Sequence, residues 1–216
     1  MADIFQEVDE DVRRDKQSEL WAKYGKVVIA AAVAIIVVTA GTVSWREYSK
    51  NRQLEAGGQF AVAKALVSAA KDAEAAKAFA ALAADADKGY AWIARLEEAA
   101  ALARSGDVEA ALGIYDALAA DSGVDESFRQ LAALHAASYL LDRGDSDGAR
   151  TRLKGLTEAA SPWRHSAREL QALVAMAEGN TEEAGKVFKA LSEDATAPRG
   201  ARARATEMLA ALGGAK

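Results

Sequence analysis

The sequence has no cysteine, only two prolines and only two histidines among its 216 residues. The absence of cysteine excludes disulfide bonds and thiolate metal sites. The two histidines, His135 and His165, lie far apart in the sequence and match no metal-binding motif, so we expect no metal site. Basic residues form no cluster and the net charge is -5, which argues against nucleic acid as a partner.

Alanine is abundant instead, with 54 residues. It has the highest helix propensity because its side chain loses no entropy in a helix. Small side chains also allow two helices to approach each other closely. We therefore predict an all-α protein with closely packed helices.

One long apolar run lies near the N-terminus, from Val27 to Trp45, and contains no charged residue in 19 positions. As a helix it would be about 28 Å long, close to the roughly 30 Å hydrocarbon core of a bilayer. Aromatic residues typical of membrane interfaces lie at both ends: Trp21, Tyr24, Trp45 and Tyr48. The run therefore predicts a transmembrane signal-anchor helix over residues 26–46.

Two other interpretations of this run fit less well. A core helix without any charge is rare in a chain of this size, and the rest of the sequence has amphipathic helices instead. A cleaved signal peptide needs a short basic segment before the apolar run and small residues after it. Here the preceding segment is long and carries seven acidic residues, and the bulky sequence SWREYSK follows the run.

Lysine and arginine residues near the two ends predict the orientation of the span. Those before it are Arg13, Arg14, Lys16, Lys23 and Lys26, and those shortly after it are Arg46, Lys50 and Arg52. Because flanking positive charges favour the cytoplasmic side, five against three predicts a cytoplasmic N-terminus. The larger C-terminal part would then lie in the periplasm of a bacterium with two membranes.

Residues 1–25 form the predicted cytoplasmic tail. Within it Ile4, Val8 and Val12 have the i, i+4 spacing of a short amphipathic helix. The tail is then either a partly ordered extension or a helix that docks on a membrane surface or a partner.

The sequence after the span repeats itself. Three similar segments read GDVEAALGIYDAL from Gly106, GDSDGARTRLKGL from Gly144 and GNTEEAGKVFKAL from Gly179. A weaker copy starts at Lys71 and aligns Phe79 with Tyr115 after a gap of one residue. A period near 34 to 38 residues in a helical sequence indicates stacked helix pairs of the tetratricopeptide type.

Each segment has the residues that a turn between two helices requires. The glycine ends one helix, because it adopts the left-handed conformation without a steric penalty. Asp107, Asp145 or Asn180 then caps the next helix, and Glu183 follows Asn180 with the spacing of a capping box. The second helices carry apolar stripes at helical spacing. These stripes are Val108, Ala111, Leu112, Tyr115 and Leu118 in one copy, and Ala184, Val187, Phe188 and Leu191 in another.

The first helices of the pairs are expected at about 88–105, 126–143 and 162–178, and a polar last helix at about 198–212. Ser161 is the predicted N-cap of the third, with Pro162 at its first position. Residues 53–70 also have a helical pattern, interrupted by Gly57 and Gly58, which predict a kink or hinge.

No group of residues points to catalysis. His165 and Ser166 are adjacent on a predicted helix, so their side chains point about 100° apart and do not form a nucleophile pair. Asp145 and Asp147 lack the further carboxylates of a calcium loop and are better explained as capping residues. Trp163 is predicted to be a core residue, with a groove-lining position as the alternative.

The opening MADIFQEVDEDVRRDKQSELWAKYG, the single span and the segments GYAWIARLEEAAALARSGD and SPWRHSAREL together carry a resemblance over nearly the whole chain. The chain resembles the small membrane-anchored tetratricopeptide-like proteins of Alphaproteobacteria, in the family of the ancillary subunit of the bacterial Sec translocon. The resemblance implies an inner-membrane protein with a periplasmic repeat domain. It also implies association with SecYEG translocon subunits and periplasmic chaperones, and a link to the coordination of cell division. It implies no catalytic residue.

The expected architecture is a tail (1–25), a span (26–46), a linker or first helix (47–70) and a TPR-like α-solenoid of about four helix pairs with a C-terminal capping helix (71–216). The expected function is a non-enzymatic scaffold without cofactor that binds proteins at the periplasmic face. The alternative is an envelope regulator, or a module that coordinates cell division, signalling through its cytoplasmic tail. Polar residues of the first helices are the candidate partner-binding residues: Arg95, Arg129, His135 and Arg168.

Overall fold

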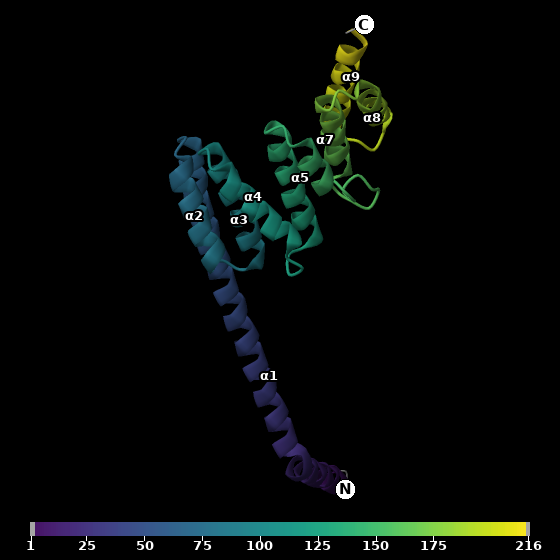
Figure 1. The fold of residues 1–216 in the computed structure, drawn as a ribbon. Coiled ribbons are helices and arrows are strands. Elements are labelled where there is room, and N and C mark those ends of the chain that lie inside the picture. The colour runs from purple at the N-terminus through teal and green to yellow at the C-terminus, as the bar shows by residue number, and fades with distance from the viewer. Residues whose placement is uncertain (1–2, 215–216) are drawn as a thin grey trace. The chain divides into compact units, whose positions relative to one another are not determined.

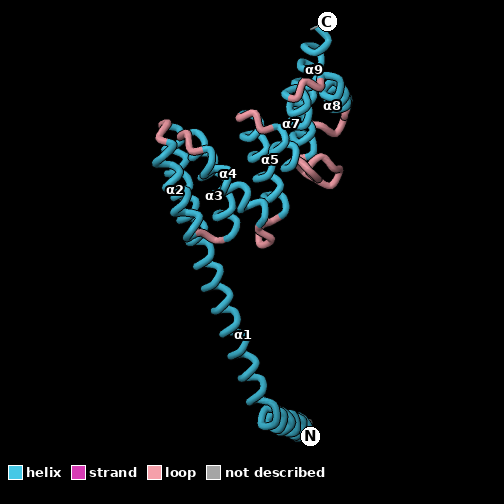
Figure 2. Tube along the Cα trace, viewed as in Figure 1, coloured by secondary structure: helices cyan, strands magenta, loops and turns pink. Residues whose placement is uncertain are grey.

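A computed structural model describes the backbone of residues 3–214 and the side chains of residue 18 and residues 21–213. The described chain contains nine helices, and Figure 2 shows only helices and loops in it. The all-α prediction is therefore confirmed. The chain divides into two compact units, Met1–Gln53 and Leu54–Lys216, and helix α1 (Asp3–Ser68) contributes to both.

The first unit contains the long apolar run, which lies within α1. The most apolar window between Trp21 and Ser68 has a mean hydropathy of 2.5, and none of it is buried. Val27 and Ile36, for example, are 65% and 66% exposed. The run is thus long and apolar enough to cross a membrane, and it is not a helix of the protein core.

The N-terminal part of α1 includes the segment predicted as a docking helix. The side chains of Ile4, Val8 and Val12, on which that prediction depends, lie outside the described residues.

The second unit contains the end of α1 and eight further helices that follow one another in space in chain order (Figure 1). Their bounds are α2 (Asp72–Asp85), α3 (Lys88–Arg104), α4 (Val108–Ala120), α5 (Glu126–Asp142), α6 (Ser146–Arg152), α7 (Arg164–Ala177), α8 (Thr181–Glu193) and α9 (Arg199–Gly214). From α2 onward each helix packs against the next. Phe60 of α1 packs on Phe79 of α2 and Tyr90 of α3, with ring centroids 5.5 and 6.5 Å apart. The end of α1 is thus the first layer of the stack.

The same turn joins α1 to α2, α3 to α4, α5 to α6 and α7 to α8. The residue with positive φ in it, here called the turn residue, is Ala70, Gly106, Gly144 and Gly179, with φ of 55°, 99°, 82° and 79°. In each turn the next residue donates its backbone N–H to a carbonyl five positions earlier, for example Asp107 to Leu102 at 2.9 Å. This is the Schellman motif, which satisfies carbonyls left free at a helix end. The glycine prediction is confirmed, and the α1 turn follows the same geometry with an alanine.

The predicted N-caps are also confirmed. Asp107, Asp145 and Asn180 accept hydrogen bonds from the backbone N–H groups three positions later, at 3.1, 2.8 and 3.1 Å. The capping box is only half correct. Glu183 accepts a hydrogen bond from the side-chain amide of Asn180, whereas the Asn180 backbone N–H binds the carbonyl of Ala175.

The turn residues also set a common register for the four helix pairs. Three positions counted from the turn residue hold small residues in all four pairs. The residues twelve positions before it are Gly58, Ala94, Ala132 and Ala167, and those seven positions before it are Ala63, Ala99, Ala137 and Ala172. The residues five positions after it are Ala75, Ala111, Ala149 and Ala184. Every alanine in these three sets has an exposed fraction of 0%. Because a larger side chain would push two helices apart, alanine at these positions permits the close packing that the composition predicts.

Two further positions hold large side chains in the core. Nine residues after the turn stand Phe79, Tyr115, Leu153 and Phe188, and twelve after it stand Leu82, Leu118, Leu156 and Leu191. In this register Lys71 corresponds to Asp107 and no gap is needed. The one-residue gap of the sequence alignment was therefore wrong.

The third pair departs from the others. Helix α6 has seven residues, whereas α4 and α8 have thirteen each, and the chain leaves the helix at Leu153. Gly155 follows with φ of 79°, a conformation that a helix does not contain. The repeat segment GDSDGARTRLKGL is therefore helical over only part of its length, because Gly155 lies within it.

Two local predictions also need correction. Helix α7 begins at Arg164, not at Pro162, because the segment from Ser161 to Arg164 forms a separate turn. Gly57 and Gly58 do not interrupt α1, which remains helical to Ser68. A Cβ atom on Gly57 would lie 3.2 Å from the Tyr90 hydroxyl oxygen, so this glycine allows α3 to pack closely against α1.

Candidate protein-binding surface

The four candidate partner-binding residues lie on the first helices of three pairs, α3, α5 and α7, as predicted. Arg95 of α3 and Arg168 of α7 are equivalent, since each stands eleven residues before its turn glycine. Both are half-buried. Equivalent positions on successive helices can form a row along one face of the stack.

Arg95 and Arg168 differ in their surroundings. Arg168 Nη1 lies 3.5 Å from Asp194 Oδ2, in the segment between α8 and α9. Burial raises the pKa of Glu98, and the positive charge of Arg95 opposes this shift. Each guanidinium thus already interacts with an acidic group of its own chain.

His135 of α5 belongs to an aromatic cluster that the sequence analysis did not predict. Its ring stacks on that of Tyr115 of α4, with centroids 5.5 Å apart, and Tyr139 stacks on the same ring at 5.9 Å. Burial lowers the pKa of His135, although the nearby Glu97 carboxylate opposes this shift. The residue as a whole stays exposed. His135 is therefore accessible and also part of the packing between two helix pairs.

Burial raises the pKa of Tyr115, and Tyr139 and Glu97 raise it further. The hydroxyl oxygen of Tyr115 lies 3.5 Å from the carbonyl oxygen of Leu96, at the limit of a hydrogen bond. The phenol thus stays neutral, as its position in the core requires.

Arg129 lies on α5 six residues before His135, which places the two side chains about 120° apart around the helix. The structure therefore does not bring these two residues to one face. Arg129 is half-buried, and its Nε has no hydrogen-bond partner among the described residues. The four candidates thus comprise two arginines at equivalent positions of α3 and α7, one stacked histidine and one separate arginine.

The segment SPWRHSAREL links α7 to its neighbours. Ser161 donates a hydrogen bond to Gln130 Oε1 at 2.8 Å, and the Trp163 indole donates to the Ser127 carbonyl at 2.8 Å. Both contacts connect to α5. Trp163 is half-buried and lies in none of the buried clusters, so the prediction of a core tryptophan was wrong.

Two residues in the middle of this segment, Arg164 and His165, contact the loop between α8 and α9. Arg164 donates to Thr196 Oγ1 at 3.2 Å, and His165 Nδ1 lies 3.6 Å from Asp194 Oδ2. Hydrogen bonds from the Thr196 side chain and backbone lower the pKa of Asp194, and the positive groups add to this. Ser166 is exposed. The segment is a structural junction, and the structure does not pair His165 with Ser166.

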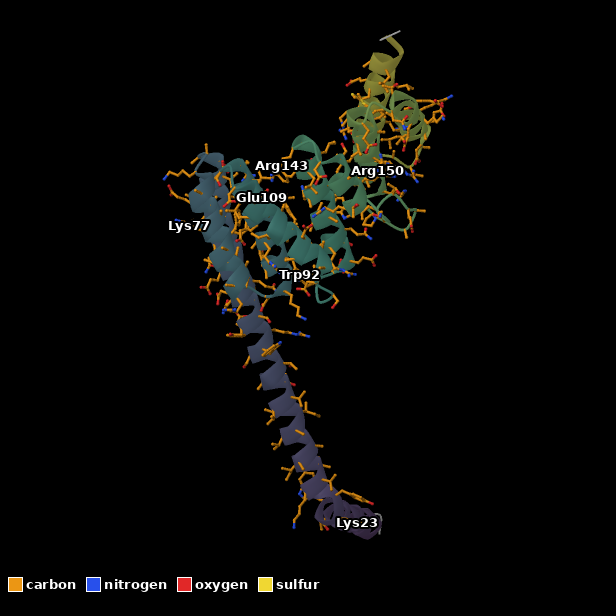
Figure 3. The ribbon with its side chains drawn as sticks, viewed as in Figure 1. Lys23, Lys77, Trp92, Glu109, Arg143 and Arg150 are labelled. Atoms are coloured by element: carbon orange, nitrogen blue, oxygen red, sulfur yellow. The ribbon has the colours of Figure 1, made fainter. Side chains whose placement is uncertain are left out.

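Ion pairs between neighbouring layers were also missed, because their partners lie about one repeat apart in sequence. The guanidinium of Arg143, the residue after α5, lies 2.5 Å from the Glu109 carboxylate of α4. Both residues are labelled in Figure 3. The others join Lys64 to Glu97, Arg104 to Asp72, Arg152 to Asp116, Arg150 to Glu178 and Arg204 to Glu169. A search for opposite charges at the repeat period would have found most of them.

The described residues contain no group of three or more His, Asp or Glu side chains that could hold a metal ion. The helices of the second unit carry arginine and aromatic side chains that are not fully buried, and these residue types are enriched in protein–protein interfaces.

The chain matches the family of tetratricopeptide repeat-like domains over residues 18–210. No curated protein and no solved structure matches it.

Proposed function

The chain belongs to the family of tetratricopeptide repeat-like domains, and from this premise we propose that it is a membrane-anchored, non-enzymatic scaffold for other proteins. Domains of this type mediate protein–protein interaction through the surfaces of stacked helix pairs. The observation that carries the proposal is the combination of such a stack with an exposed apolar helix that is long enough to cross a bilayer. The match indicates no enzymatic family.

We further propose four TPR-like repeats, each centred on one of the four turn residues, with α9 as the terminal cap. The recurrence of buried alanines and of a large residue nine positions after each turn supports this number. Arg199 and Arg204 are exposed on α9, which gives the end of the stack the polar surface that a cap needs.

The proposed topology places residues 1–25 in the cytoplasm, the anchor over 26–46, a linker or first helix over 47–70 and the repeats of 71–216 in the periplasm. It is supported by the five positive residues before the span against three after it. A periplasm-specific reporter fused after Lys216 should be active. A reporter that is active only in the cytoplasm would overturn this orientation.

The proposed partners are subunits of the Sec translocon and periplasmic chaperones, in line with the resemblance of the sequence to the ancillary translocon subunit family. The proposed contact residues are Arg95, Arg129, His135 and Arg168. A photo-crosslinking amino acid at position 135 in native membranes should capture translocon or chaperone subunits. The matched control is position 77 on α2, where the exposed Lys77 lies far from these four residues in the sequence. Equal capture from both positions, or no such subunit from either, would contradict the proposal.

The regulatory alternative makes a different prediction for the tail. A scaffold should keep its periplasmic partners when residues 1–20 are deleted, as measured by the same crosslinks. Loss of a cellular response with unchanged crosslinks would favour a regulator that signals through the tail.

A further inference from the structure

A pocket of about 200 Å³ lies between α6 and α7. Its lining residues are Arg150, Leu153, Lys154, Thr157, Gln171 and Val174. Arg150, labelled in Figure 3, belongs to α6, and Gln171 and Val174 belong to α7. The pocket thus lies in the layer between the third and fourth helix pairs.

The pocket lies where this pair lacks the aromatic ring of the other pairs. Leu153 stands nine residues after the turn glycine, where the other pairs have Phe79, Tyr115 and Phe188, each with an exposed fraction of 0%. A leucine is smaller than these aromatic residues and leaves part of the site unfilled.

The residues that face this position from the following helix also differ between the second and third pairs. In the second pair Tyr115 stacks on His135 and Tyr139 of the following helix. The residues equivalent to His135 and Tyr139 in the next layer are Leu170 and Val174. Three stacked rings are thus replaced by three aliphatic side chains, two of which line the pocket.

The short α6 keeps this space open. The chain leaves the helix at Leu153, so the last six helical residues of α4 and of α8 have no helical counterpart here. Residues 153–163 run as turns instead, and Thr157 from this segment lines the pocket.

The size and walls of the pocket suit an aromatic ring. An apolar cavity of about 150 Å³ is large enough to bind benzene, so about 200 Å³ accommodates a phenyl or phenol group. Leu153 and Val174 form apolar walls and are 5% and 1% exposed. A ring bound there would restore the kind of packing that Tyr115 makes within the second pair.

The charges around the pocket favour an acidic group beside the ring. Arg150 forms an ion pair with Glu178, and its Nη1 lies 4.0 Å from Glu183, so its charge is largely compensated. Lys154 is exposed and forms no ion pair with any residue that the structure describes. Its ammonium group is therefore available for a carboxylate of a ligand.

We infer that this pocket binds an aromatic side chain of a partner protein that has a carboxylate next to it. The inference deepens the proposed scaffold function and rests on it for the identity of the ligand as a protein segment. The site is distinct from the candidate residues Arg95, Arg129 and His135, which lie on α3 and α5.

The test uses the full chain in lipid nanodiscs and 3-phenylpropionate as the probe, with 3-phenylpropanamide and butyrate for comparison. Methyl NMR signals of Leu153 and Val174 report binding. We expect both signals to shift with 3-phenylpropionate, to shift less with the amide and to stay unchanged with butyrate. Unchanged signals with 3-phenylpropionate, or equal shifts with butyrate, would overturn the inference.

Two variants make this test specific. Leu153→Phe supplies the ring that the other pairs have, so it should fill the pocket, keep the circular dichroism spectrum and weaken binding by at least about tenfold, the equivalent of 1.4 kcal/mol. In that variant the Val174 methyl signals and calorimetric titration report binding, since Leu153 is absent.

Lys154→Gln should abolish the preference for the acid over the amide, whereas the matched control Lys77→Gln on α2 should retain it. Tight binding of 3-phenylpropionate to a folded Leu153→Phe protein would contradict the inference. If Leu153→Phe does not fold, an unchanged preference of Lys154→Gln for the acid over the amide would contradict it instead.

The outcome separates the two proposals. Failure of the probe to bind, together with specific crosslinks from position 135, would refute the pocket and leave the scaffold intact. Binding of the probe without any crosslinked partner would refute the proposed partners and leave the pocket as a site for an aromatic acid.

Discussion

Tyr115 and Leu153 occupy the same place in two consecutive helix pairs, and their surroundings differ. Tyr115 is fully buried and stacks on two rings, whereas Leu153 has aliphatic neighbours and borders a pocket of about 200 Å³. The alanines that set the spacing between helices are the same in both pairs. Small residues thus maintain the spacing of the stack, and the size of the large residue in each layer determines whether the layer is filled or leaves a pocket.

The largest expected effect comes from removing the large residue itself. Tyr115→Ala should lower the free energy of unfolding by about 4 kcal/mol, because it removes a buried ring and leaves a cavity. Leu153→Ala should cost less, about 2 kcal/mol, because fewer atoms are lost and the site is already open. Urea unfolding of both variants, followed by circular dichroism, measures the difference. Equal losses would show that the two layers do not differ in packing.

Enlarging an alanine of the common set tests the role of these residues. Ala111→Leu should destabilise the protein by about 2 kcal/mol, because its exposed fraction is 0% and the added methyl groups would force helices apart. The control is Ala117→Leu on the same helix, where the side chain is exposed and the stability should change little. Thermal unfolding of the two variants provides the measurement. Similar midpoints would argue against a spacing role for Ala111.

The N-caps differ between the first pair and the others. Asp107→Ala should lose about 1 kcal/mol, since the Ala110 N–H would lose its acceptor. Lys71 occupies the corresponding position and makes no capping hydrogen bond, so Lys71→Asp should stabilise the protein. The denaturation midpoint should be lower than that of the parent chain for Asp107→Ala and higher for Lys71→Asp. A loss of stability in Lys71→Asp would contradict the assigned register.

Substitutions of two turn residues should change the free energy of unfolding by smaller amounts and in opposite directions. Ala70 has φ of 55°, which costs an L-residue about 1–2 kcal/mol relative to glycine, while glycine loses more entropy on folding. Ala70→Gly should therefore stabilise the protein by about 0.5 kcal/mol. Gly106→Ala, at φ of 99°, should destabilise it. Calorimetric midpoints that move in the same direction for both variants would refute this explanation.

The smallest effect concerns pH, because His135 in the ring cluster titrates and its counterpart Leu170 does not. Burial lowers the pKa of His135 in the folded protein, so the unfolded chain binds more protons below its own pKa of about 6.5. This contribution to stability should thus be complete well above pH 6.5 and should be lost as the pH falls below about 6.5. His135→Leu should weaken this dependence, as unfolding at several pH values would show. The remaining slope includes His165, whose pKa burial also lowers.

Local elements were the most predictable part of the fold. The glycine turns and the caps at Asp107, Asp145 and Asn180 depend on backbone conformation and on residues within one turn, so the sequence pattern was sufficient. The early end of α6 was missed, because Gly155 lies among residues that otherwise favour a helix. The start of α7 was placed two residues early, because Ser161 binds Gln130 and the Trp163 N–H instead of capping that helix directly.

The candidate site was predictable only in part. The sequence placed Arg95, Arg129, His135 and Arg168 on the first helices of their pairs, which the structure confirms for their position but does not test for binding. It did not predict that His135 stacks on Tyr115, since the two belong to different pairs. The pocket had a sequence signal, the leucine at position 153 where the other pairs have a ring.

The sequence alone determined the helical class, the repeat period, the turns and the apolar helix that is long enough to cross a membrane. These features depend on composition, periodicity and near neighbours along the chain. The tertiary structure decided the close contact of Gly57 with Tyr90, the stacked rings around Tyr115 and the pocket beside Leu153. Each of these depends on how much volume facing side chains leave between two helices, and periodicity identifies the faces without specifying that volume.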